Sequence, residues 1–234
     1  RCIYCDFDST TLLEKRAQYV AAVCRELEMR KDYLKGEPIQ TIYLGGGTPS
    51  LLPISLLQTV FQALAEHYSV APAAEITMEA NPDDLSSAYI QDVVDKLPIN
   101  RLSMGVQTFN DEALRFLNRR HTGQQAIDTV KRCQEAGLNN ISIDLIYGLP
   151  NESLEDWEKD LRIATSLHVQ HISAYHLMYE EGSPLWRLRE SMNLKEADED
   201  LSLLFFEKLV NTLKEHGFQH YEISNFCLPG MHSR

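Results

Sequence analysis

The chain has 234 residues, and its content of 44% hydrophobic and 24% charged residues is typical of an ordinary soluble globular protein. Its formal net charge is −12, from 22 basic and 34 acidic residues, and no run of Lys or Arg is longer than two. Because a protein that contacts many phosphates needs a dense basic surface, we expect no nucleic-acid partner. No stretch approaches the ~18 consecutive apolar residues of a membrane helix, so we expect no integral membrane span.

The chain contains five cysteines: Cys2, Cys5, Cys24, Cys133 and Cys227. An odd number in a chain of this size does not indicate a disulfide scaffold, and it favours a reducing, cytoplasmic setting. Cys24 and Cys133 lie in helix-like stretches and Cys227 lies near the end, where packing is the favoured role of each.

Short β-rich runs alternate along the chain with longer stretches of helical periodicity. In chain order, the predicted strands are Thr41–Leu44, Glu75–Met78, Arg101–Gly105, Ile141–Ile146, His171–Tyr175 and Tyr221–Ser224. The predicted helices are Leu12–Leu34, Leu52–His67, Ser87–Leu97, Asp111–Leu117, Gly123–Ala136, Leu154–Ser166 and Ala197–His216. This alternation is typical of βαβ crossovers and a parallel sheet, and no linker divides residues 1–234, so we expect one domain.

A polar segment follows each of the first five strands, at intervals of about 30 residues, the size of one βα unit. These segments begin with the glycine loop Gly45–Thr48 and continue with Glu79, Gln107, Asp144 and His176. The carboxyl ends of parallel strands share one rim, where β/α barrels place their chemistry. Polar strand ends are common, but this combination predicts a functional site.

The C-x-x-C pair formed by Cys2 and Cys5 has three open interpretations: half of a zinc site, a redox dithiol, or part of an iron–sulfur segment. No second ligand pair of zinc spacing exists, and a thioredoxin-like pair belongs to a smaller βαβ fold. These observations favour iron–sulfur ligation.

Consecutive glycines in Gly45–Thr48 allow a ligand to approach the backbone closely. The ligand could be a phosphate, a carboxylate or an ammonium group, because the loop lacks both the P-loop lysine and the G-x-G-x-x-G spacing.

The carboxylates of Glu79 and Asp144 suit ribose hydroxyls or an ammonium group, the amide of Gln107 suits mixed donors and acceptors, and Arg119 could bind a carboxylate. A structural hydrogen bond or salt bridge remains an alternative for each. His121, His171 and His176 could be ligands or acid–base groups, although a structural role is favoured.

Eight segments, which together extend over nearly the whole chain, have the order and spacing found in oxygen-independent coproporphyrinogen III oxidases. They are CIYCDF, YLGGGTPS, EANP, NRLSMGVQTF, LNRRH, DLIYGLP, SAYHL and YEISNF. The chain therefore resembles this radical S-adenosylmethionine (SAM) family, and most of all its haem chaperone (HemW-like) branch. The resemblance implies an α/β fold, a partial (β/α)6-type TIM-like barrel that this chain would truncate at both ends.

The resemblance also implies a C-x-x-x-C-x-x-C motif that holds a [4Fe–4S] cluster. Cys2 and Cys5 match its second and third cysteines, and the first would precede this chain. SAM would chelate the open iron, and its reductive cleavage would give a 5′-deoxyadenosyl radical. By the same resemblance, the residues that line the SAM site are Tyr4, Gly46, Gly47, Thr48, Glu79, Gln107, Arg119, Asp144 and Ala174.

Two departures from the oxidase pattern bear on function. The oxidases carry a further cysteine two residues after the last cluster ligand, and here that position is Phe7. The second departure is that family members continue beyond residue 234 into a C-terminal domain. Phe7 favours a haem chaperone, which binds haem and passes it to a recipient protein, over an oxidase that decarboxylates a porphyrinogen with electrons from a donor such as flavodoxin or ferredoxin. A phosphate-binding β/α-barrel enzyme is a third possibility.

Overall fold

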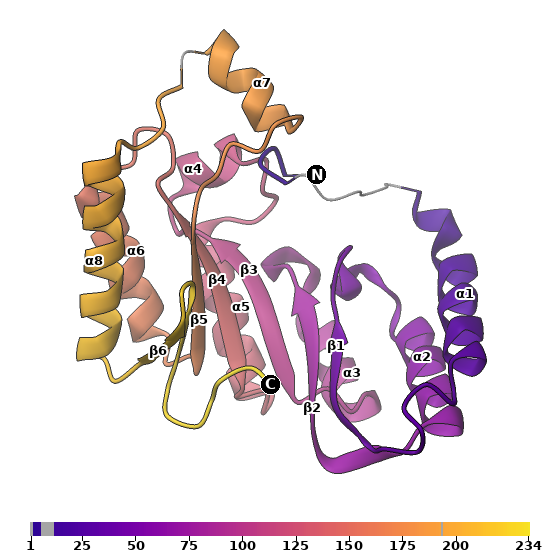
Figure 1. Ribbon diagram of the computed structural model, residues 1–234. Helices are drawn as coiled ribbons and strands as arrows, with labels where there is room; N and C mark the ends of the chain where they lie inside the picture. The colour runs from indigo at the N-terminus through magenta and orange to yellow at the C-terminus, as the bar shows by residue number, and fades with distance from the viewer. Residues whose placement is uncertain (1, 6–11, 193) are drawn as a thin grey trace.

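The computed structural model describes residues 2–5, 12–192 and 194–234. Within these residues, seven strands form one sheet in the order β1-β2-β3-β4-β5-β7-β6. Neighbours among the first five strands pair in parallel, and the sheet curls into an open trough (Figure 1). These five strands are β1 (Ile39–Leu44), β2 (Val70–Ala80), β3 (Arg101–Gln107), β4 (Ile141–Tyr147) and β5 (His171–His176).

Most of the helices flank the outer side of the curled sheet, whereas α4 and α7 lie beyond the carboxyl ends of the strands (Figure 1). They are α1 (Arg16–Met29), α2 (Ile54–His67), α3 (Ser87–Lys96), α4 (Asp111–Phe116), α5 (Gly123–Glu135), α6 (Leu154–Ser166), α7 (Pro184–Ser191) and α8 (Glu199–Glu215). Short 3₁₀ turns occur at η1 (Leu13–Lys15), η2 (Pro49–Leu51) and η3 (Pro82–Asp84). None of the helices in the described part of the chain is long and apolar enough to cross a membrane.

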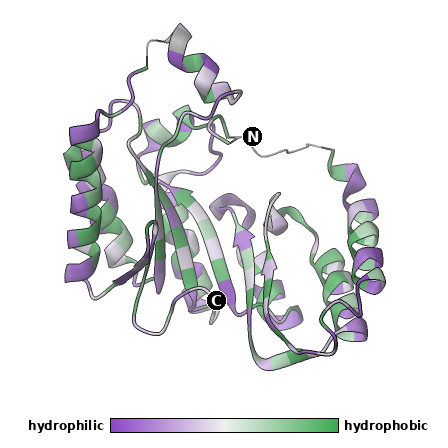
Figure 2. Ribbon diagram, viewed as in Figure 1, coloured by the Kyte–Doolittle hydropathy of each residue, from purple (hydrophilic) through white to green (hydrophobic). Residues whose placement is uncertain are grey.

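The two faces of the sheet differ in polarity because side chains alternate along each strand. In β3, Leu102, Met104 and Val106 are completely buried against the helices, whereas Arg101 and Ser103 line the inner face. Figure 2 shows this alternation of hydrophobic and hydrophilic residues along the strands. Most parallel sheets are apolar because both of their faces are covered. The polar inner face of this sheet is therefore unusual, and it is a candidate ligand-binding surface.

The predicted strand Tyr221–Ser224 is confirmed only at Tyr221 and Glu222, because residues 223–224 form the turn of a hairpin between β6 (Gln219–Glu222) and β7 (Asn225–Cys227). The carboxylate of Glu222 accepts hydrogen bonds from Ser224 N at 3.0 Å and Asn225 Nδ2 at 2.6 Å, which turns the chain between the two strands. β7 then pairs with β5 in an antiparallel direction, so the sheet is mixed at this edge.

One predicted helix is too long, and one helix of the structure was not predicted. The predicted helix Leu12–Leu34 is shorter in the structure, because residues 30–36 form turns that end in the left-handed pair Lys35 (φ 50°) and Gly36 (φ 83°). Helix α7 was not predicted, although Pro184 stands at its first turn and the Ser183 hydroxyl caps it by accepting from Trp186 N at 3.1 Å.

Candidate functional site

The two cysteines of the C-x-x-C pair lie on a short segment above the carboxyl ends of the strands, beside α4 and α7 (Figure 1). Ile3 N donates to Leu117 O at 3.3 Å, and Leu185 N donates to Ile3 O at 2.9 Å. These two backbone hydrogen bonds connect the segment to the end of α4 and the start of α7. The unpredicted helix α7 therefore helps to position the cysteines.

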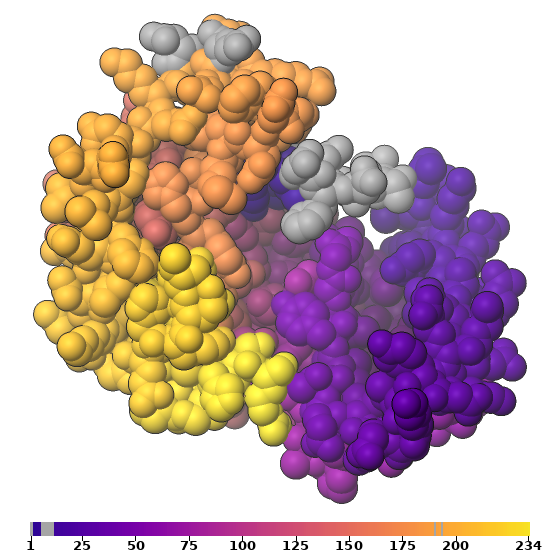
Figure 3. Space-filling model, viewed as in Figure 1, coloured from indigo at the N-terminus to yellow at the C-terminus, as the bar shows by residue number. Residues whose placement is uncertain are grey.

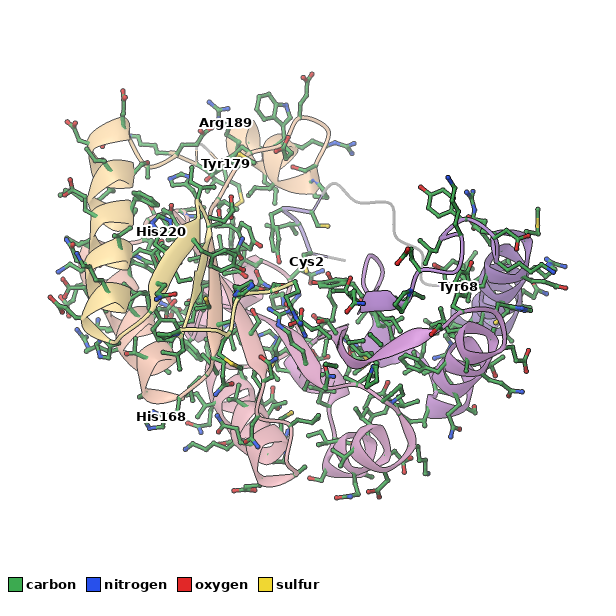
Figure 4. All side chains as sticks on the ribbon, turned by 60° about the horizontal axis from the view of Figure 1, so that its bottom comes forward. Cys2, Tyr68, His168, Tyr179, Arg189 and His220 are labelled. Atoms are coloured by element: carbon green, nitrogen blue, oxygen red, sulfur yellow. The ribbon has the colours of Figure 1, made fainter. Side chains whose placement is uncertain are left out.

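The chain that flanks α7 is held by aromatic contacts. The guanidinium of Arg189 lies 5.2 Å from the ring centre of Trp186 and 5.9 Å from that of Tyr179, and Figure 4 shows Arg189 and Tyr179 at the same end of the molecule. Such cation–π contacts contribute about 0.5–1 kcal/mol each at exposed positions. They join α7 to the segment that follows β5.

Arg119 connects the cysteine segment to the sheet. Its Nη1 donates to Cys2 Sγ at 3.3 Å, while its Nη2 donates to Asn81 Oδ1 at 2.7 Å and to Gly105 O at 2.6 Å. Its Nε is buried and has no hydrogen-bond partner within the described residues. The guanidinium is thus fixed beside a cysteine sulfur and retains one free donor.

Cys2 lies near the middle of the molecule, between the two arms of the curled sheet (Figure 4). Tyr4 lies between the two cysteines: burial first, and then the negative charge of Cys2, raises the pKa of its hydroxyl far above the ordinary value. Tyr4 therefore stays protonated and remains a hydrogen-bond donor at this rim.

The glycine loop is shaped by Glu79. Gly46 N donates to Glu79 Oε2 at 3.1 Å, and the Tyr43 hydroxyl donates to Glu79 Oε1 at 3.0 Å. Gly46 has φ +99°, a conformation that side chains disfavour. A Cβ atom added at Gly46 or at Gly47 would meet no atom within 4 Å, so both glycines face open space that a ligand could fill. Thr48 follows them and ends the loop.

Gln107 ends β3 in a left-handed conformation, with φ 72°, which is unusual for any residue other than glycine. Its side chain crosses the inner face near Gly105, where an added Cβ would lie 2.9 Å from Gln107 Nε2 and 3.3 Å from Arg119 Nη2. Gly105 therefore makes room for both side chains. Strained backbone of this kind occurs often at functional sites.

Asp144 lies deeper in the trough, within hydrogen-bonding distance of the Ser103 hydroxyl at 3.5 Å. Burial first, and then the charge of Glu79, raises the pKa of this carboxyl to about 7. A carboxyl group whose pKa is raised in this way is typical of functional sites.

A cavity of about 200 Å³ occupies the inner face of the sheet and contains both Glu79 and Asp144. Figure 3 shows a hollow on this face, between the C-terminal segment and the β1 edge. The residues that line the cavity are Tyr43, Glu79, Arg101, Ser103, Asp144, His171, Ser173, Tyr175, Tyr221, Asn225 and Ser233. Glu79 and Asp144 thus share one cavity, whereas Arg119 and Gln107 meet at Gly105, nearer to Cys2.

Ala174 differs from the other predicted site residues. Its side chain is 2% exposed and belongs to the hydrophobic core on the outer side of the sheet, and its N–H donates to Ser224 O at 2.8 Å. Any contribution of Ala174 to a ligand site has to come from its backbone.

The three histidines make structural hydrogen bonds, in agreement with the favoured interpretation. His121 Nε2 bonds to Val106 O at 3.0 Å. Both ring nitrogens of His176 are bonded, Nδ1 to Leu177 O at 2.9 Å and Nε2 to Ser202 Oγ at 3.0 Å. Both ring nitrogens of His171 are bonded, to Ser142 Oγ at 2.7 Å and to the Tyr221 hydroxyl at 2.8 Å. Burial first, and then the nearby Arg101, lowers the pKa of His171 to about 4, so this ring is neutral near pH 7.

The structure adds residues that the sequence did not single out. Tyr43 and Asn81 bond to predicted site residues, and Arg101 lies in the same cavity as Asp144. The signal for Tyr43 and Arg101 was available, because both alternate with apolar neighbours in their strands.

Comparison with known proteins identifies the family. Residues 1–164 match the radical SAM superfamily. The chain belongs to the radical SAM superfamily. This confirms the family recognised from the eight segments, and members of this superfamily generally carry a [4Fe–4S] cluster and use SAM.

Individual radical SAM relatives extend the match over the whole chain. The heme chaperone HemW of Lactococcus lactis is 36% identical over 234 residues, which are 100% of this chain and 60% of the relative. HemW of Escherichia coli is 36% identical over 232 residues, covering 98% of this chain and 60% of the relative. The chain thus spans about three-fifths of the length of these curated relatives.

Among solved structures, the radical SAM enzyme coproporphyrinogen III oxidase HemN of Escherichia coli aligns with a TM-score of 0.88 and 25% identity. The alignment covers 98% of this chain and 53% of that protein. This match confirms the predicted α/β fold class, a partial TIM-like barrel, although one edge of the sheet is antiparallel.

The residues of this radical SAM chain fit the cofactors of the superfamily in part. Cys2 and Cys5 are two cysteines at the correct rim, and the open side of the glycine loop and the free Nε of Arg119 leave room and a donor for a polar ligand. Within the described residues, no three His, Cys, Asp or Glu side chains lie together as a metal-binding group. Phe7, which favours the chaperone branch, lies outside the described residues.

Proposed function

We propose that this chain is the radical SAM core of a cytoplasmic haem chaperone, which binds haem and transfers it to a recipient protein. The observation that carries the proposal is the 36% identity to heme chaperones along essentially the entire chain. The phenylalanine at position 7 supports it, because the resemblance to the oxidases predicts a cysteine there.

In this proposal, Cys2 and Cys5 supply two of the three thiolates that hold a [4Fe–4S] cluster. Arg119 donates a hydrogen bond to the Cys2 sulfur, which orients that ligand and adds a positive charge beside it. Helix α7 and the end of α4 hold the segment in place through the backbone of Ile3. When bound, the cluster and SAM would supply one-electron chemistry.

The same proposal assigns the SAM site to the rim above the trough. The backbone of Gly46, Gly47 and Thr48 would face the ligand, with Gly46 held in position by Glu79. The remaining members of the proposed site are Tyr4, Glu79, Gln107, Arg119, Asp144 and the backbone of Ala174. Carboxylates suit the ribose hydroxyls and the ammonium group of SAM, and a guanidinium suits its carboxylate.

The alternative function is that of an oxygen-independent coproporphyrinogen III oxidase. The observation in its favour is the TM-score of 0.88 to HemN. This function would need an electron donor such as flavodoxin or ferredoxin, a porphyrinogen substrate and productive cleavage of SAM. Since a fold can host several functions, the heme chaperone relatives outweigh this likeness.

The cluster assignment can be tested in the intact protein after anaerobic reconstitution with iron and sulfide. We expect the broad visible absorption of a [4Fe–4S] cluster, and its loss in the double variant Cys2→Ala, Cys5→Ala. The matched control is Cys24→Ala, which removes a half-buried thiol on α1 that donates to Thr59 O at 3.8 Å and should leave the absorption unchanged. A cluster retained in the double variant would contradict the assignment.

The function itself needs a paired experiment on the intact protein. One sample is titrated with haem and followed by the Soret absorption, and a second receives coproporphyrinogen III, SAM and a reductant. We expect haem binding and no decarboxylated product. Product formation would establish the oxidase alternative, and an absence of haem binding would contradict the chaperone proposal.

A further inference from the structure

Arg101 is a buried cation that no step of the proposed function uses. It begins β3, is 3% exposed and lines the 200 Å³ cavity on the inner face of the sheet. Its one side-chain hydrogen bond in the described structure is a long one, from Nη1 to Thr77 Oγ1 at 3.5 Å, and its Nε has no partner. A guanidinium has five N–H donors, so most of this hydrogen-bonding capacity is unused.

Within the described part of the chain, no counter-ion lies close to this charge. Among the residues that the structure describes, no carboxylate oxygen lies within 4.0 Å of the Arg101 nitrogens. Glu79 shares the cavity, but its oxygens lie more than 4.0 Å from the Arg101 nitrogens and accept from Tyr43 and Gly46. Asp144 shares the cavity too; burial and then the charge of Glu79 raise its pKa to about 7 although the charge of Arg101 lowers it, so Asp144 is only partly ionised at neutral pH.

An unpaired buried charge is strongly unfavourable, and proteins rarely retain one without a partner. The neighbouring His171 cannot supply a negative charge, and both of its nitrogens are already bonded. The floor of the trough therefore offers a buried positive group to a ligand in the cavity. A carboxylate is the natural partner, because its two oxygens match the guanidinium fork.

We propose that Arg101 is the carboxylate receptor of the trough and binds a propionate arm of the tetrapyrrole. The proposal rests on the proposed haem-binding function for the identity of the ligand, although the carboxylate site itself does not depend on it. A cavity of about 200 Å³ is smaller than the ~300–1,000 Å³ of typical small-molecule pockets, so it accommodates one arm and not the macrocycle.

The margin of the cavity suits the flat ring that would remain outside. Tyr43, Tyr175 and Tyr221 line the cavity, and each leaves about half of its side chain exposed. Aromatic side chains pack favourably against planar ligands in offset or edge-on arrangements. Arg101 would bind the propionate, and these tyrosines would contact the macrocycle. The site would thus recognise two chemically different parts of one molecule.

The test compares haem with haem dimethyl ester, whose propionates are esterified, in the intact protein and in Arg101→Met. We expect the native protein to bind haem about 10–100-fold more tightly than the diester, the range for a lost charged hydrogen bond. The variant should bind both ligands equally. Undiminished preference for haem in the variant would overturn the proposal.

Thermal unfolding without haem separates a carboxylate site from a structural role. Arg101→Met removes an unpaired buried charge, so the melting temperature of the variant should equal or exceed that of the native protein. A large decrease in the melting temperature would identify a structural ion pair and contradict the proposal. The control is Arg132→Met on α5, which removes hydrogen bonds to Leu85 O and Thr129 Oγ1. It should lower the melting temperature without changing haem selectivity.

Two further measurements separate the proposed function from the site and identify the source of the carboxylate. Sodium propionate, compared with sodium chloride at equal ionic strength, should raise the melting temperature of the native protein and not that of Arg101→Met. If propionate raises the melting temperature but haem does not bind, the chaperone function is refuted and the carboxylate site is supported. If propionate does not raise the melting temperature, the carboxylate site is refuted. SAM affinity should be the same in both proteins, and a weaker affinity in Arg101→Met would assign the carboxylate to SAM and overturn the propionate assignment.

Discussion

Gly123, the first residue of α5, packs against the loop that follows Gln107. A Cβ atom added at Gly123 would lie 2.2 Å from Phe109 O, so Phe109 would have to move by at least 0.8 Å to reach the 3.0 Å limit of real contacts. The same loop is held by Asp160, which accepts from Phe109 N at 3.0 Å and from the Thr108 hydroxyl at 2.5 Å. A shift of Phe109 would therefore weaken buried hydrogen bonds as well.

The sign of the effect of Gly123→Ala follows from these magnitudes. Alanine gains up to about 1 kcal/mol over glycine in a helix. Overpacking costs about 1–3 kcal/mol, and a weakened hydrogen bond about 1 kcal/mol more. We therefore expect Gly123→Ala to lower the free energy of unfolding by about 1–3 kcal/mol.

Urea unfolding followed by circular dichroism measures this change in Gly123→Ala. The control is Gly47→Ala, where the new Cβ meets no atom within 4 Å and φ is not in the left-handed region, so stability should change by less than about 0.5 kcal/mol. An unfolding free energy for Gly123→Ala equal to that of the native protein would refute the packing argument.

Three further predictions concern the trough, the core and α7. Because the pKa of Asp144 is raised to about 7, the folded protein retains a proton that the unfolded chain releases above about pH 4. The contribution of Asp144 to stability thus falls between about pH 4 and 7. In urea unfolding, the unfolding free energy of Asp144→Asn relative to that of the native protein should therefore rise over this interval. A difference between the two unfolding free energies that does not change with pH would contradict this. Trp157→Phe removes the buried hydrogen bond to Phe205 O at 3.1 Å and should cost about 1–3 kcal/mol of unfolding free energy, whereas an unchanged urea midpoint would mean that the bond contributes nothing. Ser183→Ala removes the cap of α7 and should increase proteolytic cleavage near that helix without changing the global urea midpoint, and equal cleavage rates would count against it.

The parallel strands and most helices were predictable because each carries a local signal. The periodicity of β3 and the Ser153 cap of α6 are read directly from the sequence, and the structure agrees: Ser153 and Asp156 form a capping box. The hairpin of β6 and β7 could not be predicted, because its antiparallel pairing with β5 joins residues more than 50 positions apart. Its turn depends on the side chain of Glu222, whose role is visible only in three dimensions.

The candidate site was predictable to the level of the rim and no further. Sequence spacing placed Glu79, Gln107 and Asp144 at the ends of neighbouring strands. The structure agrees for Glu79 and Gln107, whereas Asp144 lies in the middle of β4 and therefore deeper in the trough. It could not show that Glu79 supports the glycine loop, or that the Ala174 side chain faces the core. Both facts depend on which face of the curled sheet each side chain occupies and on what lies opposite it.

The outer face of the sheet provides most of the stability, and the inner face carries the candidate functional groups. The outer face is packed with large, fully buried side chains such as Trp157, Phe205 and Met104, so burial of apolar surface there contributes most of the folding free energy. The inner face carries Arg101, which has no carboxylate within 4.0 Å among the described residues, and Asp144, whose pKa is raised; this arrangement lowers stability unless a ligand compensates it. A fold that is stabilised by the packing on its outer face can tolerate Arg101 and Asp144 on its inner face. Substitutions that remove these two groups should therefore raise the stability of the ligand-free protein and weaken its ligand binding.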